Sequence, residues 1–262
     1  LEDFEILSAC IRDPLRAMED EWFRNSSDTD WSNFNYVVHG RGRKDVPAHV
    51  RETFRIGVYH GGSICEADYD TGHDDMTLDD FCALEIARLA GLKPPHVVSI
   101  RLYTSDSYNL FSSFLRCADE KGQPHPIKTT IYFLNDAIKK LRKVVAKTNP
   151  HEYNQVIYLW RGIKNRVMDL EEFKKHGGTE LATMSATGNK EIAMRYAAGD
   201  EGLLMSFATQ GLSRGVQISE FSLYPHEKEF VYPPLTFLLL DRSREVTHED
   251  GLTIVPILPQ MA

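Results

Sequence analysis

The sequence predicts an α+β fold, in which a mainly helical first half, residues 1–150, precedes a mainly stranded second half, residues 151–262. Apolar residues recur three or four positions apart through most of the first half, as on the buried face of a helix. In the second half, short runs of β-branched and aromatic residues alternate with turn residues, which is typical of strands. No flexible linker separates the halves, so we expect one integrated domain, and 262 residues can bury a sizeable core.

The first half is expected to contain helices joined by loops. Residues 4–23 have helical spacing, with a break or a helix start near Pro14, and residues 25–45 have the Ser, Asp, Asn and Gly content of a loop. Thr77 and Asp80 resemble a capping box that begins a helix closed by Gly91. The remaining expected elements are a short strand or the lead into a helix at 97–103, a helix near 108–116, a turn at 122–126 and a helix over 131–145.

Two groups of basic residues in this half are interpreted as solvated surface. The loop at 25–45 holds a small cluster, and the outer face of the helix at 131–145 holds a larger one, for which an acceptor-docking surface is the alternative. These residues are Arg41, Arg43 and Lys44 in the loop, and Lys139, Lys140, Arg142 and Lys143 on the helix.

The acidic stretch at 68–75 does not fit a calcium loop. Counted from Asp68, the sixth position is His73 and the twelfth is Asp79, where an EF-hand needs Gly and Glu. We therefore expect a loop ahead of a helix, and we assign His60 and His73 surface or structural roles.

The cysteines do not predict a metal site. The four thiols, Cys10, Cys65, Cys82 and Cys117, are far apart and form no Cys-x-x-Cys pair, so zinc is not expected. A reduced, intracellular protein is favoured, with one or two disulfides as the alternative.

Composition limits the classes of function. Apolar residues make up 42% of the chain and charged residues 26%, which is ordinary for a soluble globular protein. The net charge of −8 argues against a nucleic-acid partner, because phosphate backbones are bound by clustered Lys and Arg. No apolar run approaches the roughly 20 residues of a membrane span, and no secretory signal is visible at the start.

The second half is expected to hold strands that end in polar side chains. Residues 156–160 form a β-rich run ending at Arg161 and Gly162; an arginine there suits an anion such as phosphate, and a glycine allows close approach to the backbone. Residues 181–187 could form a second strand that ends in hydroxyl side chains. For Thr187, a helix N-cap role is at least as plausible as catalysis.

The other expected elements of the second half are two helices and three strands. They are a helix at 169–176, a helix at 190–198, a strand at 203–207, a strand at 216–224 with a bulge near Glu220, and a strand at 235–240.

Two acids lie between the last two of these strands. Glu227 and Glu229 are separated by one residue, so in an extended backbone both side chains point to the same face. We expect them on a turn at the edge of the sheet, where loops on a rigid scaffold often carry chemistry.

Three motifs, in order, resemble the Arg–Ser–Glu-x-Glu class of mono-ADP-ribosyltransferases. They are a strand ending in Arg161-Gly162, a strand ending in Ser185-Ala186-Thr187, and the run from Phe221 through Glu227-Lys228-Glu229 to Pro234. The chain is most similar to arginine-specific enzymes of the vertebrate ecto-enzyme type, which share a fold with cholera-like toxins. The resemblance covers about residues 153–240, and it implies a two-sheet β-sandwich core on which the helical half packs. The family commonly has Ser-Thr-Ser where this chain has Ser-Ala-Thr, which alters the supporting hydroxyls.

The resemblance also implies roles for the residues. Arg161 would contact the phosphate and ribose of NAD, Gly162 would present its backbone to the nicotinamide amide, and Phe207 would stack on nicotinamide. Ser185 would hold NAD and orient Glu229, which would stabilise the oxocarbenium-like transition state. Glu227 would position and help deprotonate the attacking guanidinium.

The activity that follows is transfer of ADP-ribose from NAD, as co-substrate, to a protein arginine with release of nicotinamide. Alternatives are a Ser or Thr acceptor on a partner protein, water as acceptor, or an inactive NAD-binding module. No metal, no nucleic acid and no membrane span are expected, and the protein could act in the cytoplasm or as a secreted effector in a host cell.

Overall fold

The computed structural model describes residues 12–39, 70–73, 76–117, 123–164, 168–199 and 202–261. These residues form two compact units. The first unit comprises the described part of Leu1–Leu141 together with Glu220–Pro225, and the second comprises the described part of Arg142–Ser219 and His226–Ala262. The chain therefore passes from the second unit into the first and back again just before the acid pair.

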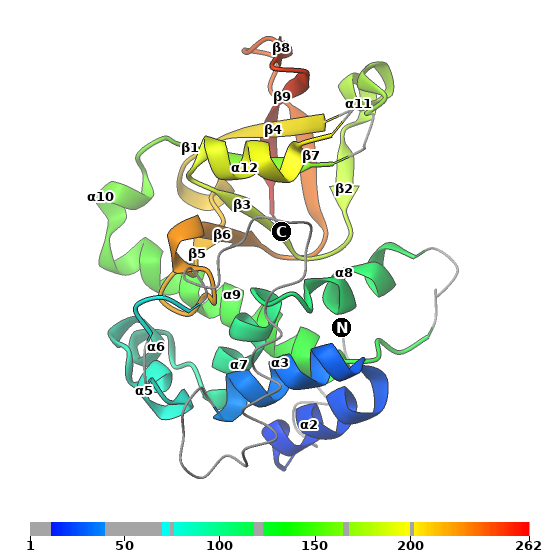
Figure 1. Cartoon of the computed structure of the whole chain (residues 1–262). Coiled ribbons are helices and arrows are strands. Elements are labelled where there is room, and N and C mark those ends of the chain that lie inside the picture. Colours follow the sequence, from blue (N-terminus) through cyan, green and yellow to red (C-terminus); the bar gives the residue numbers. More distant parts are fainter. Residues whose placement is uncertain are drawn as a thin grey trace. The chain divides into compact units, whose positions relative to one another are not determined.

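The first unit is built from helices (Figure 1). Its most enclosed element is α7, in which every residue from Pro95 to Tyr103 is buried, and Trp22 and Phe111 pack in the same core. The helices are α2 (Pro14–Asn25), α3 (Asp28–His39), α5 (Leu78–Ala83), α6 (Glu85–Ala90), α7 (Pro94–Tyr103), α8 (Tyr108–Arg116) and the larger part of α9 (Lys128–Thr148).

Several predicted helix boundaries are confirmed. Asp13 caps α2, which starts at Pro14 as predicted. Thr77 and Asp80 form the predicted capping box, with the Thr77 N–H 2.7 Å from the Asp80 carboxylate. The predicted helix is nevertheless divided at Leu84 into α5 and α6, and Gly91 ends α6 with a φ of 62°.

Two predictions in the first half are corrected. Residues 28–39, expected as loop, form α3, because Ser27 and Asp30 cap its start and Phe34 and Val37 are buried along one face. Residues 97–103, expected as a short strand or the lead into a helix, belong to α7.

Some residues named in the sequence analysis lie outside the described residues. They are the basic loop cluster at 41–44, His60, Cys10 and Cys65.

The second unit holds the described strands, which form one hydrogen-bonded sheet in the order β2-β7-β9-β4-β1-β3-β6-β5, with β8 beside β9. Only β4 and β9 run parallel among the described pairs. The strands are β1 (Ile157–Ile163), β2 (Gly178–Glu180), β3 (Met184–Thr187), β4 (Gly202–Thr209), β5 (Val216–Gln217), β6 (Glu229–Tyr232), β7 (Thr236–Leu240), β8 (Thr247–Glu249) and β9 (Leu252–Gln260). Helices α10 (Pro150–Tyr153), α11 (Leu170–His176) and α12 (Lys190–Ala197) belong to this unit, and α12 packs on β1, β3 and β4 (Figure 1).

Two strand predictions need correction. β1, predicted to end in Arg161-Gly162, continues one residue further to Ile163, and all seven of its residues are in register with β4. The strand predicted at 216–224 ends at Gln217, and no bulge lies near Glu220. The change of apolar parity there has another cause: Phe221 and Leu223 bury their side chains in the first unit.

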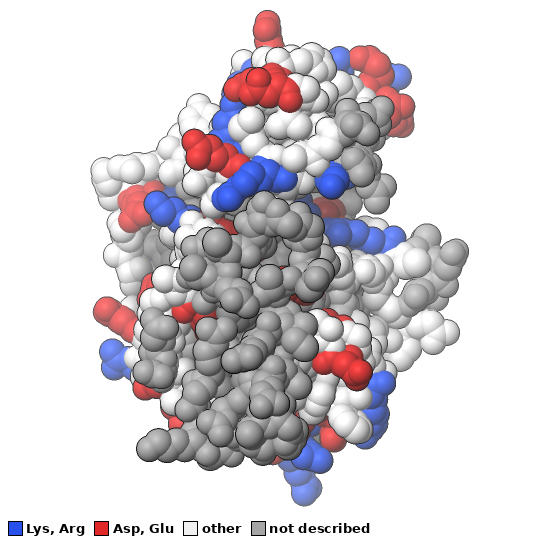
Figure 2. Space-filling view, viewed as in Figure 1, with Lys and Arg blue, Asp and Glu red and all other residues white. Residues whose placement is uncertain are grey.

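Charge is spread over the visible surface. On the described part of the face in Figure 2, Lys and Arg side chains are interspersed with Asp and Glu. In the described residues, no helix is long and apolar enough to cross a membrane.

Candidate active site

The structure brings three predicted residues together on neighbouring strands. Arg161 lies on β1, Ser185 on β3 and Glu229 at the start of β6. β3 lies between the other two strands, and its Thr187 is in register with Glu229. The Arg161 guanidinium donates to the main-chain oxygen of Ser185 at 2.6 Å, which fixes the arginine beside the serine.

Glu229 is a half-buried carboxyl with an unusual proton affinity. Burial raises its pKa, and the negative charge of Glu227 raises it further. A hydrogen bond with the Ser185 side chain and the positive charge of Arg161 oppose this, and the pKa comes to about 8. At neutral pH this carboxyl is therefore largely protonated, and a positive charge placed beside it would favour its ionised form.

The backbone between the two acids differs from the predicted extended form. Glu227 ends a short 3-10 turn, η5 (Pro225–Glu227), and Lys228 has a left-handed φ of 47° before β6 begins. The assumption that extended geometry alone places both acids on one face is therefore wrong. The negative charge of Glu227 nevertheless raises the pKa of Glu229.

Glu227 is held by the last residue of β3 and by a residue of α12. The Tyr196 hydroxyl donates to the Glu227 carboxylate at 2.8 Å, and the Thr187 hydroxyl donates to the Glu227 main-chain oxygen. Burial raises the pKa of Glu227, whereas the Tyr196 hydrogen bond and the charges of His226 and Arg195 lower it. The side chain of Glu227 is thus oriented from α12.

Thr187 and Tyr196 were not assigned to the site from the sequence. The N-cap of α12 is Asn189, so the N-cap role considered for Thr187 is wrong, although its hydroxyl does accept from the Asn189 N–H at 3.0 Å. Tyr196 is 52% exposed at the end of a helix. Its sequence signal is an aromatic residue on a helix that follows the hydroxyl motif, and that signal alone does not indicate a partner.

Gly162 is needed for helix packing. A Cβ built at this position would lie 1.9 Å from the main-chain oxygen of Ala193 and 2.7 Å from the main-chain nitrogen of Ala197. Because main-chain atoms of α12 cannot move aside easily, α12 packs directly on β1 only if residue 162 is glycine. The space that the sequence suggested for a ligand on this side is therefore filled by α12.

Phe207 is placed differently from the prediction. Its side chain is 0% exposed in the core of the sheet, and its ring centroid lies 6.0 Å from that of Tyr232. A stacking ligand needs an open ring face, which the buried ring of Phe207 does not offer.

The site's chemistry is that of charged groups. Arg161 offers a planar cation for an anionic ligand, and each of the two carboxyls carries a negative charge and can accept a proton when it is ionised. Among the residues described here, no three His, Cys, Asp or Glu side chains are grouped as a metal site. Cys82 and Cys117 are free thiols.

The comparison with protein families identifies one match. Residues 84–253, more than half of the chain, match the family model described as NAD:arginine ADP-ribosyltransferase. This range contains Arg161, Ser185, Glu227 and Glu229. No curated protein sequence matches the chain.

Solved structures with a similar fold include two bacterial ADP-ribosyltransferases and a bacterial exoenzyme. HopU1 of Pseudomonas syringae pv. tomato DC3000 is 16% identical with a TM-score of 0.51, over 73% of this chain and 91% of that one. The Vis toxin of Vibrio splendidus is 16% identical with a TM-score of 0.51, over 71% and 83%. The C3 exoenzyme of Clostridium limosum is 14% identical with a TM-score of 0.50, over 71% and 95%. At these identities, the likeness concerns the fold.

Proposed function

Because this chain belongs to the NAD:arginine ADP-ribosyltransferase family, and is therefore an NAD-dependent mono-ADP-ribosyltransferase, we propose that its acceptor is an arginine side chain of a protein. The observation that carries the proposal is the pair Glu227 and Glu229, with Glu229 bonded to Ser185 and Glu227 bonded to Tyr196. We further propose that residues 151–262 bind NAD and catalyse the reaction, and that the helical residues 1–150 help select the acceptor.

Arg161 is proposed to bind the phosphate and ribose of NAD. Its guanidinium is fixed by the main chain of Ser185, and a planar fork of donors matches phosphate oxygens. Gly162 would present its main chain to the nicotinamide amide, on the side not covered by α12.

Glu229 is proposed to assist cleavage of the nicotinamide glycosidic bond. As that bond breaks, its electron pair goes to the nicotinamide nitrogen and positive charge develops on the ribose. A carboxylate beside the ribose stabilises this charge more in the transition state than in the ground state. The pKa of about 8 belongs to the protein without NAD; the cationic nicotinamide ring would favour the ionised carboxyl when NAD binds.

Glu227 is proposed to position the acceptor guanidinium and to accept a proton from it. A guanidinium is protonated at neutral pH, so it is attracted by a carboxylate and must lose a proton as its nitrogen bonds to the ribose. Glu227 can accept that proton, and the hydrogen bond from Tyr196 leaves its second carboxylate oxygen for the acceptor.

The core is proposed to have the two-layer sandwich form implied by the resemblance. β1 pairs with β4 along its whole length but with β3 through one registered pair, Trp160 and Thr187. A sheet joined by a single pair can bend sharply there, and this supports two layers meeting at the site.

Labelled NAD tests the acceptor. We expect the protein to transfer label to agmatine, a small guanidinium compound, and to proteins of a cell lysate, and we expect neutral hydroxylamine to release the protein-bound label. Label that resists hydroxylamine, with no product on agmatine, would favour a Ser or Thr acceptor. Nicotinamide release without any labelled acceptor would favour water, and NAD binding without nicotinamide release would indicate an inactive module.

A further inference from the structure

The segment that leads to Glu227 belongs to the first unit. The chain leaves the second unit after Ser219, runs through the first unit as Glu220–Pro225 and returns at His226. Just upstream, the Ile218 N–H still donates to the main-chain oxygen of Glu229 at 3.0 Å. Residues 220–225 are all described, and none of them belongs to a strand, so sheet pairing does not hold them.

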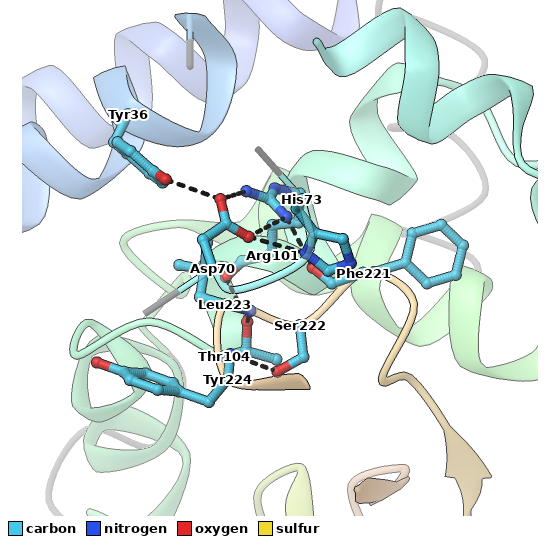
Figure 3. A network of polar contacts seen from close by, with 9 residues as sticks. All are labelled: Tyr36, Asp70, His73, Arg101, Thr104, Phe221, Ser222, Leu223 and Tyr224. Atoms are coloured by element: carbon cyan, nitrogen blue, oxygen red, sulfur yellow. Dashed lines mark hydrogen bonds and ion pairs between the residues drawn. The ribbon is translucent and has the colours of Figure 1, made fainter. Parts of the chain in front are cut away.

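Side-chain and main-chain groups of the first unit hold this segment instead (Figure 3). Arg101 donates to the main-chain oxygen of Phe221 at 3.1 Å, and the Thr104 hydroxyl accepts from the Leu223 N–H at 3.0 Å. The Asp70 N–H donates to the main-chain oxygen of Leu223 at 2.6 Å. The side chains of Phe221 and Leu223 are 1% and 0% exposed, so these main-chain bonds are shielded from water.

Asp70 and Arg101 fix one another. The guanidinium binds both carboxylate oxygens, at 3.2 and 2.7 Å, in a buried, two-pronged ion pair. Tyr36 and His73 also bond to the carboxylate, at 2.7 and 2.9 Å. Burial raises the pKa of Asp70, but hydrogen bonds from His73, Arg101 and Tyr36 and the charge of Arg101 outweigh it and lower the pKa to about 2. The Asp70 carboxyl is therefore ionised at neutral pH.

The hold on Leu223 is also tied to α7. The Thr104 hydroxyl that accepts from Leu223 donates to the main-chain oxygen of Arg101 at 2.8 Å, so its orientation is set. Leu223 thus has both main-chain polar groups bound by residues of the helical unit, four positions before Glu227.

We propose that Asp70, Arg101 and Thr104 are positioning residues for the acceptor glutamate: by fixing the main chain of Phe221 and Leu223, they restrict where Glu227 can lie. This inference rests on the proposed function of Glu227. Glu229 is held separately, by the pairing of β6 with β3 and by Ser185. Loosening the segment therefore affects the acceptor step and spares NAD cleavage.

The test compares variants that differ by one contact. Thr104→Val removes the acceptor of the Leu223 N–H while keeping the side-chain shape, and Thr104→Ser keeps the hydroxyl. Asp70→Asn weakens the ion pair. Asp136→Asn is the matched control, because Asp136 pairs with Lys140 and His96 and has no described bond to residues 220–225.

Two readouts are measured: hydrogen–deuterium exchange of peptides covering residues 217–232, and the ratio of transfer to agmatine or lysate proteins over NAD hydrolysis. We expect Thr104→Val and Asp70→Asn to speed hydrogen–deuterium exchange at residues 220–228. We also expect them to lower the ratio of transfer to NAD hydrolysis about fivefold or more, because small misplacements of a reacting group cost large factors in rate. The KM for NAD should stay within about twofold of the wild-type value. Thr104→Ser and Asp136→Asn should resemble the wild type.

The outcomes separate the two claims. The positioning role is overturned if a folded Thr104→Val protein shows unchanged hydrogen–deuterium exchange. It is also overturned if exchange is faster but the ratio of transfer to NAD hydrolysis is unchanged. If Asp70→Asn does not fold, Thr104→Val alone tests the positioning role. A wild-type protein that releases no nicotinamide and labels no acceptor contradicts the proposed function instead.

Discussion

The environment of the Glu229 carboxyl makes the stability of the folded protein depend on pH. Its pKa of about 8 lies above its ordinary value of 4.5, so the folded protein binds this proton more tightly than the unfolded chain does. The stability that the group contributes is complete below about pH 4.5 and is lost as the pH rises through 8. The site thus retains a carboxyl whose ionisation destabilises the fold, as expected of a functional residue.

Replacing Glu229 with Gln should remove this pH dependence. Since Gln resembles the protonated acid, we expect Glu229→Gln to gain stability over the wild type as the pH rises from 5 to 8, by at least about 1.4 kcal/mol, the equivalent of one pKa unit. Thermal unfolding at both pH values measures the difference. If the gap between the two proteins is the same at pH 5 and pH 8, the pKa of Glu229 is not raised.

Replacing Tyr196 should slow transfer to the acceptor more than it slows hydrolysis of NAD. Tyr196→Phe removes the hydrogen bond to the Glu227 carboxylate and keeps the ring. We expect transfer to agmatine to fall about tenfold, the equivalent of 1.4 kcal/mol for a bond to a charged group, with hydrolysis of NAD changed less than about twofold. An equal fall in both activities would mean that Tyr196 does not act through Glu227.

At the scale of elements, the packing of α12 on β1 supports the site. This helix carries Tyr196 and the strand carries Arg161, so we expect their separation to affect both the proposed acceptor contact and the proposed NAD contact. Gly162 permits the short distance, and the sequence could not distinguish this packing role from close approach of a ligand.

Gly162→Ala tests that role. The added Cβ would clash with main-chain atoms of α12, so we expect a loss of about 1–3 kcal/mol or more in the free energy of unfolding. Gly188→Ala is the control, because nothing lies within 4 Å of its Cβ position and its φ is not in the left-handed region; it should change stability by less than about 0.5 kcal/mol. Chemical denaturation of both variants measures the difference, and equal stabilities would contradict the packing account.

Other elements show where local patterns succeed and fail. α9 follows from the helical spacing of its apolar residues, and β4 follows from a short, nearly continuous apolar run. α3 was missed because its polar residues hid an apolar face that only tertiary burial identifies. The parity change near Glu220 was visible in the sequence, but its cause, a passage of the chain between units, depends on contacts more than 100 residues apart in the chain, such as Arg101 with Phe221.

At the scale of the whole molecule, the sequence predicted which residues meet but not how each is held. Arg161, Ser185 and Glu229 were predicted from motif order, and strand pairing brings them together. The supports of Glu227 could not be predicted, since Tyr196 has no distinguishing pattern and the motif that contains Thr187 does not identify Glu227 as its partner. The division of the chain was also hidden, because residues 220–225 join the helical unit through side chains far away in sequence.

The central claim is that the two glutamates have separate tasks. Its most direct test is to measure nicotinamide release and transfer to agmatine for Glu229→Gln and Glu227→Gln, with folding checked by circular dichroism. We predict that Glu229→Gln lowers both activities roughly 100-fold or more, as expected when a group that stabilises transition-state charge is lost. Glu227→Gln should abolish transfer and leave NAD hydrolysis within about threefold of the wild type. A folded Glu229→Gln protein that still releases nicotinamide at the wild-type rate would contradict the account.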